Sequence, residues 1–348
     1  MPARKRLIWK HVLLALMIGL LLPGCGCAPR LRRFQTVFTD VFDTVTVLTA
    51  YAADQEQFDL LAEEAHRELL EYHRLFDIYR EYPDTVNLCT LNRLGHEEAL
   101  AVAPPILDML EDAVTLSRQS SGQMNPAMGS VLRLWHEARE QGQADPAGAA
   151  LPSPKALAEA AQHTALSQLI LDREAGTVYL ADPGLLLDVG AVAKGWAAQQ
   201  ICVQLQEAGY DSFLLSIGGN VCARGTKADG SSWVVGVENP GESDYLARLQ
   251  LSDMCAVTSG SYQRYYTVDG QDYHHIIDPD SLYPAEGYRL ITVLHCDSAT
   301  ADALSTALFC MSREEGQTLA RTMDAQVLWL LEDGSLHMTE GFQNFLEK

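Results

Sequence analysis

Short apolar segments alternate with longer amphipathic helices along the chain after residue 33, and this alternation limits the possible fold more than any other feature. The clearest helix covers residues 54–72, where Phe58, Leu61, Ala65 and Leu69 recur at the spacing of one helix face. The clearest buried strand is the apolar run at residues 213–217. A chain that mixes both kinds of element in this way is expected to fold as an α+β (mixed α/β) protein.

The other expected elements follow from the same patterns. Further strands are predicted at residues 34–51 (as a pair), 168–171, 177–180, 185–189 and 326–331. Further helices are predicted at residues 105–120, from about 126, and at 155–162, 192–208, 300–311 and 313–323. Residues 136–154 are rich in Ala, Gly, Pro and Gln, a composition that favours a surface loop.

The first residues have the pattern of an export signal. Four basic residues up to Lys10 precede an apolar run at residues 12–22, which is shorter than the roughly 20 residues that span a bilayer. The Leu-Pro-Gly-Cys ending resembles a bacterial lipoprotein cleavage site, with Cys25 as the lipidated residue. A plain secretory signal is the alternative, and it is less favoured because a cysteine stands where cleavage is expected. We therefore expect a signal peptide at 1–24, a lipid-anchored tether at 25–33 and one folded unit at 34–348. The membrane partner would be the extracytoplasmic face of the bacterial inner (cytoplasmic) membrane, on the periplasmic side in a Gram-negative cell.

Charge excludes one class of partner. The formal net charge is −21, and removal of residues 1–24 would make it more negative, because that segment holds four basic and no acidic residues. Nucleic acid is therefore not expected as a partner, since phosphate backbones attract basic surfaces. The seven cysteines other than Cys25 form no C-x-x-C pair and are expected to be buried free thiols.

Two distant stretches, residues 187–195 and 302–309, have the character of one phosphate and metal site. Asp302 and Thr306 stand four residues apart on an apolar helix, so they share one face, and paired hard oxygens suit Mg²⁺ bound to a ligand's phosphates. Lys194 lies in the first turn of a helix, where anions bind, but it also fits a solvated surface lysine. Asp188 is equally suited to a helix cap and to a ligand contact.

Three more segments are weaker candidates when each is taken alone. Gly218, Gly219 and Asn220 follow a buried strand and fit either a close approach to a ligand or a simple hairpin turn. The loop containing Ser259 and Gly260 has hydroxyls that suit hydrogen bonds to phosphate or ring edges, and it also suits a surface turn. His274 and His275 are adjacent in a strand, so only one of them faces a given site.

In their order along the chain, these segments resemble the ApbE family, the FAD:protein FMN transferases. The resemblance covers nearly all of the chain from residue 34, and it includes Thr90-Leu91-Asn92 and residues 132–135. It implies a T-fold-type catalytic unit of two intertwined subdomains that binds FAD and Mg²⁺. It also implies transfer of FMN, through its phosphate, to a Thr or Ser hydroxyl of an acceptor protein, with release of AMP. The acceptor would be a subunit of a membrane redox complex or an extracytoplasmic flavoprotein.

The same resemblance assigns roles to single residues. It places Mg²⁺ between the side chains of Asp302 and Thr306 and the carbonyl of Ala191, and it makes His275 the general base. The FAD contacts that it implies are Asp188, Lys194, Gly218, Gly219 and Asn220, with Phe42, Tyr79, Met124 and Ile276 at or near the flavin.

Two departures from the family pattern concern the FAD contacts. Met124-Asn125-Pro126-Ala127 stands where the family usually has Phe-Asp-x-Thr, so an acid and a hydroxyl are lost, and Asn125 is left to hydrogen-bond a ligand amide or ribose. Asp77-Ile78-Tyr79 replaces a common Ser-x-Tyr, and the retained tyrosine favours transfer. The alternatives are a Mg²⁺-dependent FAD pyrophosphatase that gives FMN and AMP, and a lipid-anchored flavin-binding protein without catalysis.

Overall fold

The computed structural model describes residues 31–348, so the predicted signal peptide and Cys25 lie outside the described residues. The expectation of a mixed α/β fold is confirmed. The first strand begins at Arg32, inside the segment 25–33 that the sequence assigned to a tether. No helix among these residues combines the length and the apolar character that crossing a membrane requires.

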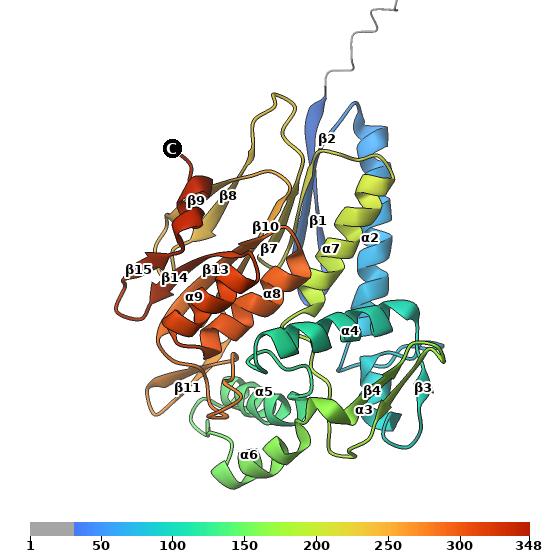
Figure 1. Cartoon of the computed structure of the whole chain (residues 1–348), viewed down its shortest axis with the longest axis vertical. Helices are drawn as coiled ribbons and strands as arrows, with labels where there is room; N and C mark the ends of the chain where they lie inside the picture. Colours follow the sequence, from blue (N-terminus) through green and yellow to red (C-terminus); the bar gives the residue numbers. More distant parts are fainter. Residues whose placement is uncertain (1–30) are drawn as a thin grey trace, which may run out of the picture.

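One antiparallel sheet of eight strands organises the molecule (Figure 1). Its order is β1-β2-β6-β7-β10-β13-β14-β15, and every neighbouring pair is antiparallel. The strands are β1 (Arg32–Val41), β2 (Thr44–Ala52), β6 (Phe213–Ile217), β7 (Asn220–Arg224), β10 (Met254–Gly260), β13 (Tyr288–His295), β14 (Gln326–Leu331) and β15 (Leu336–Met338).

Four helices cover one face of this sheet: α2 (Gln55–Phe76), α7 (Ala193–Glu207), α8 (Ser298–Ala307) and α9 (Arg313–Thr322). Their starts follow local chemistry, because Asp54 caps α2, Asp297 caps α8, and Ser312 with Glu315 forms a capping box on α9. The other face packs against the ribbon of β8 (Trp233–Glu238) and β9 (Tyr245–Leu251) and the short helix η4 (Glu340–Phe345).

A second, smaller layer lies beside the helical face (Figure 1). It contains α3 (Leu88–Leu94), α4 (Pro104–Gln119), α5 (Gly129–Ala144) and α6 (Pro154–Ala160), with η1 (Ala161–His163) and η2 (Leu166–Gln168). Its sheet has the order β3-β5-β4, from β3 (Leu100–Ala101), β5 (Thr177–Leu180) and β4 (Leu169–Asp172). The chain returns to this layer later, as the hairpin of β11 (Tyr265–Val268) and β12 (Gln271–His274), which packs on α5.

Two predictions of secondary structure were wrong. Residues 136–144 belong to α5, because Val131 and Trp135 bury one helix face and the Glu, Ala, Arg and Gln residues that follow are good helix formers. Residues 185–189 form no helix or strand and join no sheet. The backbone N–H and C=O groups of this segment form hydrogen bonds with side chains and loops instead. An example is the pair of hydrogen bonds between Asn92 and Leu187.

The cysteines are free thiols in the described part, but only Cys202, Cys222 and Cys255 are buried. Cys89 and Cys310 are half-buried and Cys296 is exposed, so the expectation of burial was wrong for these three.

Candidate active site

A cavity of about 360 Å³ lies between the two layers, and it collects most of the residues singled out in the sequence. Its wall is formed by the start of α7, the inner face of α8, the β6–β7 turn, the end of β10, the segment after β12 and one face of α5. Twelve predicted site residues line it: Tyr79, Met124, Asn125, Asp188, Ala191, Lys194, Gly218, Asn220, Ser259, Gly260, His275 and Ile276. The predicted metal ligands Asp302 and Thr306 line the same cavity.

Asp302 joins helix α8 to the start of helix α7. Its side chain is buried, and Oδ2 accepts a 2.8 Å hydrogen bond from the Gly195 backbone nitrogen. Gly195 is the third residue of α7, so its N–H has no partner within the helix. The N-cap residue, Val192, makes no side-chain hydrogen bond to this helix end. Lys194 Nζ lies 3.8 Å from the same carboxylate oxygen. Asp302 therefore caps the neighbouring helix and still faces the cavity.

The surroundings of Asp302 fit a hard cation. Burial raises the pKa of its carboxyl, while Lys194, the Gly195 N–H and the Asn220 amide favour its charged form. Asn220 Nδ2 is buried and has no hydrogen-bond partner of normal geometry among residues 31–348. No group of three or more His, Cys, Asp or Glu side chains within that range could hold a metal. A cation at Asp302 and Thr306 would therefore need backbone and ligand oxygens as well, which is how Mg²⁺ binds with phosphates.

The segment that carries Asp188 and Ala191 turns sharply before α7. Asp188 Oδ1 accepts a 2.9 Å hydrogen bond from Gly190 N, whereas the N-cap of α7 is Val192. The helix-cap alternative for Asp188 is therefore wrong, and the residue closes an Asx turn. Burial raises the pKa of its carboxyl against the opposing effects of the Gly190 N–H and nearby positive groups.

Gly218 and Gly219 form the hairpin turn, one of the two alternatives that the sequence left open. They are the two central residues of the β6–β7 hairpin, with φ of 54° and 95°, which suits a type I′ turn. A Cβ on Gly218 would lie 2.5 Å from Thr44 Oγ1, so the turn packs closely against the start of β2. Gly218 and Asn220 line the cavity, whereas the structure places Gly219 outside its wall.

Ser259 has a different hydrogen-bonding role from the one expected. Ser305 Oγ donates its single proton to the carbonyl of Asp302 at 2.8 Å, and Ser259 Oγ lies 2.8 Å from Ser305 Oγ. Ser259 must therefore donate to Ser305, since a hydroxyl has one proton. This leaves only acceptor lone pairs facing the cavity, which suit an N–H or O–H of a ligand rather than a phosphate oxygen.

The two histidines separate as strand geometry requires. His274 points away from the cavity, with Nε2 2.8 Å from the Ala285 carbonyl and Nδ1 accepting from Ile276 N. His275 lines the cavity, and its Nδ1 is buried without a hydrogen-bond partner among the described residues. Burial, together with positive charge from Arg264, His274 and Arg139, lowers the pKa of His275 to about 3. The imidazole is therefore neutral near pH 7.

The remaining predicted contacts differ in how they face the cavity. Asn125 lies on the wall, but its Nδ2 donates to the Thr164 carbonyl and its Oδ1 accepts from Ala127 N, so its amide mainly holds loops together. Phe42 lies outside the wall, because its backbone has φ of 54° and its ring packs edge-on against His73. Tyr79 is 59% exposed at the rim, with its ring 5.0 Å from that of His136.

Sequence reasoning gave no site role to one wall of the cavity, although residues 132–135 were part of the family resemblance. Leu132, Trp135, His136 and Arg139 lie on one face of α5, and their three- and four-residue spacing was the signal that could have revealed them. The other missed lining residues are Thr44, Gln123, Met128, Gly190, Thr258, Gln263, Arg264 and Ile277.

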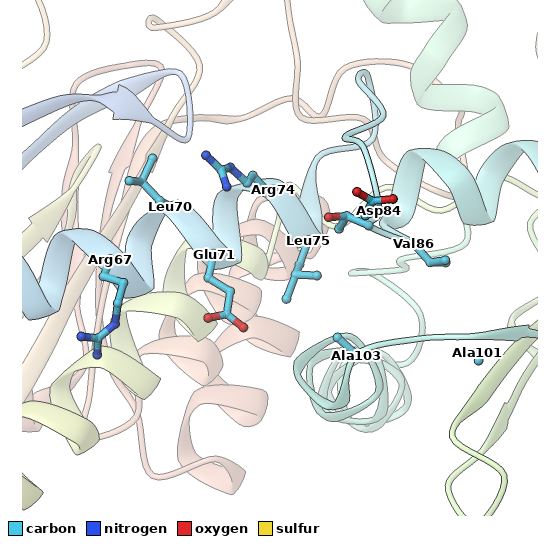
Figure 2. A pocket seen from close by; sticks show the side chains of 10 residues that line it. Arg67, Leu70, Glu71, Arg74, Leu75, Asp84, Val86, Ala101 and Ala103 are labelled. Atoms are coloured by element: carbon cyan, nitrogen blue, oxygen red, sulfur yellow. The ribbon is translucent and has the colours of Figure 1, made fainter.

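A larger hollow of about 580 Å³ lies beside α2, near residues 84–86 and 101–103 (Figure 2). Its lining mixes the opposite charges of Arg67, Glu71, Arg74 and Asp84 with apolar leucine, valine and alanine side chains. None of the buried polar atoms left without a partner in residues 31–348 belongs to it. Three such atoms face the smaller cavity, in Gln123, Asn220 and His275, so the smaller cavity is the better candidate for a ligand site.

An antiparallel sheet with a polar cavity at one end of its helical layer defines this chain as an α/β protein with a candidate ligand site between its layers. Solved structures contain the same fold. The ApbE protein of Thermotoga maritima matches with a TM-score of 0.79 and 26% identity, over 91% of this chain and 100% of that one.

The sequence comparisons show the family. The ApbE family model matches residues 42–329, and the chain belongs to the ApbE family. A protein named FAD:protein FMN transferase from Treponema pallidum is 30% identical over 95% of this chain and 92% of its own length. A protein of the same name from Klebsiella pneumoniae is 30% identical over 70% of this chain and 76% of its own length.

Proposed function

We propose that this protein transfers FMN from FAD to a Thr or Ser hydroxyl of an acceptor protein and releases AMP. The observation that carries the proposal is the meeting, in one cavity, of the buried Asp302, the half-buried Thr306 and a neutral histidine whose Nδ1 has no partner among the described residues. Membership of the ApbE family and similarity to proteins named FAD:protein FMN transferases support it.

In the proposed reaction the acceptor oxygen bonds to the phosphorus of the FMN moiety, and the bond from that phosphorus to the bridging oxygen breaks. His275 takes the hydroxyl proton at Nδ1, and AMP leaves with the bridging oxygen. General bases contribute about 10² to 10⁴ in rate. Asp188, Asn220 and Ser259 would hold FAD in place, with Ser259 accepting a hydrogen bond from the ligand.

Mg²⁺ fits the proposed site because Asp302, Thr306 and the Ala191 carbonyl offer hard oxygen ligands. When bound, it would supply neutralising charge for the pyrophosphate and the leaving AMP. Lys194 lies 3.8 Å from Asp302 and would add positive charge on the same side, toward phosphate. The exposed guanidinium of Arg264 and the half-buried one of Arg139 add two positive groups near His275.

We further propose that the protein acts outside the cytoplasmic membrane, anchored through lipid on Cys25. The support is the apolar run at residues 12–22 with its Leu-Pro-Gly-Cys ending. A lipid anchor would hold the site near acceptors such as subunits of membrane redox complexes. Labelling cells with a radioactive fatty acid tests this, because Cys25→Ala should remove the label from the protein.

The activity is tested by incubating the full-length protein in detergent with FAD, Mg²⁺ and an acceptor domain. An acceptor mass increase equal to esterified FMN, with one AMP released per label and loss of both on chelation, is the expected result. Free FMN with AMP but without labelling would establish a pyrophosphatase instead, and bound FAD with neither product would establish a binding protein.

Variants separate the proposed roles. Asp302→Ala should abolish metal-dependent turnover, whereas His275→Ala should spare FAD binding but slow transfer by about 10² to 10⁴. His66→Ala is the matched control, because His66 lies on α2 outside the cavity and pairs with Asp40. Normal transfer by His275→Ala would exclude His275 as the base.

A further inference from the structure

We propose that Asn92, which lies outside the cavity wall, is a positioning residue that fixes Asp188 and Ala191 for FAD and cation binding. The identity of the ligands, FAD and a cation, rests on the proposed function. The positioning role itself is argued from hydrogen bonds within the protein. Asn92 itself does not line the cavity.

Asn92 makes the two hydrogen bonds that a partner strand would make. Its Oδ1 accepts from Leu187 N at 2.7 Å and its Nδ2 donates to the Leu187 carbonyl at 2.9 Å, across 95 residues of sequence. In an antiparallel ladder one residue exchanges the same pair of bonds with its partner. The amide of Asn92 thus takes the place of a partner strand beside a segment that belongs to no sheet.

Adjacent contacts complete the support of this segment. Asp188 N donates to the Pro126 carbonyl and Gly129 N donates to the Leu186 carbonyl, each at 2.9 Å. Leu187 sits between them with its side chain 1% exposed. Because Leu187 is buried, losing the hydrogen-bond partner of its backbone N–H or C=O would cost free energy. Asn92 therefore fixes the residue directly before Asp188.

Helix α3, which carries Asn92, is itself held in place by hydrogen bonds. Asn87, at the start of α3, is fully buried, caps the helix through Thr90 N, and donates from Nδ2 to the carbonyls of Arg74 and Arg80. These bonds hold the first turn of α3, whereas Asn92 makes its bonds to Leu187 from the second turn. Asn87 also supplies a control, because it stabilises the same helix without touching the segment that carries Asp188.

The first test follows the segment directly, without any ligand. Hydrogen exchange of the full-length free protein, read by mass spectrometry, should show faster exchange at residues 185–191 in Asn92→Ala than in the wild type. Asn87→Ala should speed exchange in α3 but leave residues 185–191 much less affected. Unchanged exchange at 185–191 in Asn92→Ala would overturn the proposal.

The second test measures FAD affinity with Mg²⁺ by quenching of flavin fluorescence, well below the midpoint of thermal unfolding. Asn92→Ala and the equally sized Asn92→Asp, which keeps the acceptor but loses the donor, should each raise the Kd for FAD about tenfold. Asn87→Ala should change it less than twofold. Equal losses in Asn87→Ala and the Asn92 variants would show a merely structural role.

The two tests fail in different ways. If the wild type does not bind FAD, the proposed function is wrong, but the exchange result still decides the positioning role. If Asn92→Ala does not fold, Asn92→Asp is carried through both measurements, and wild-type behaviour in both would overturn the proposal.

Discussion

Replacing Gly195 with alanine should separate helices α7 and α8 at the point where the site is built. A Cβ at this position would lie within 2.5 Å of the Asp302 Cβ and closer still to the Ser298 carbonyl oxygen. Both of these atoms belong to helix α8 and neither is the flexible end of a side chain, so α8 itself must move. Movement of α8 would also break the hydrogen bond from Gly195 N to Asp302.

The expected loss of stability combines three terms. Overpacking costs about 1 to 3 kcal/mol, and loss of a hydrogen bond to a charged group costs about 1.5 to 3 kcal/mol. Alanine in a helix returns up to about 1 kcal/mol relative to glycine. The free energy of unfolding should therefore fall by about 1.5 to 6 kcal/mol. Mg²⁺-dependent FAD binding should be lost with the geometry of Asp302.

Urea unfolding and FAD titration measure the two effects on the same preparations. Gly316→Ala is the matched control, because Gly316 is also buried in a helix, but its added Cβ would meet the movable end of the Leu308 side chain at 3.0 Å. That variant should be close to wild type in stability and in FAD affinity. If Gly195→Ala matched Gly316→Ala in both, the close packing of α7 on α8 would not hold the site.

Three further predictions concern single side chains in the cavity. Asp302→Asn, which keeps an acceptor for Gly195 N but loses the charge, should remove the Mg²⁺ dependence of FAD binding with little change in the thermal midpoint; retained dependence would exclude Asp302 as a ligand. The lowered pKa of His275, about 3 in the folded protein against an ordinary 6.5, means that only the unfolded chain takes up this proton between those values. The free energy of unfolding should thus decrease as the pH is lowered through that window, by about 2 kcal/mol from pH 6.5 to 5. In urea titrations, His275→Gln should show a smaller decrease, and the same dependence on pH in both proteins would refute the assignment. Ser259→Ala and Ser305→Ala should both weaken FAD binding in fluorescence titrations, because Ser305 orients the acceptor lone pairs of Ser259; tighter binding by Ser305→Ala would mean that Ser259 donates to the ligand.

Periodicity predicted the elements that bury a regular apolar face. The strands at 177–180, 213–217 and 326–331 have the predicted bounds, and the helix predicted at 192–208 matches α7 to within one residue at each end. In these segments tertiary packing and local pattern agree. The same holds for Asp302 and Thr306, whose spacing on one helix was enough to place them together.

The pattern failed where side chains replace ordinary secondary structure. The apolar run 185–189 has the composition of a strand, but no sequence pattern shows that its partner is the amide of Asn92. The α5 wall was missed because composition favoured a loop after His136, although the helix continues to Ala144. Asn125 was assigned to a ligand from its position alone, and its bonds to Thr164 and Ala127 depend on contacts that only the fold supplies.

The electrostatics of the cavity explain how an acidic protein can hold an anionic ligand. The whole chain carries a formal charge of −21, which repels a pyrophosphate at long range. At about 0.15 M salt that repulsion is screened beyond about 8 Å, so the groups lining the cavity dominate once the ligand has entered. Those groups include Lys194, Arg139 and Arg264 against the carboxylates of Asp188 and Asp302. A cation at Asp302 would turn this near balance into a positive site, and such a site attracts the phosphates of FAD while the acidic surface outside still opposes nonspecific binding of nucleic acid.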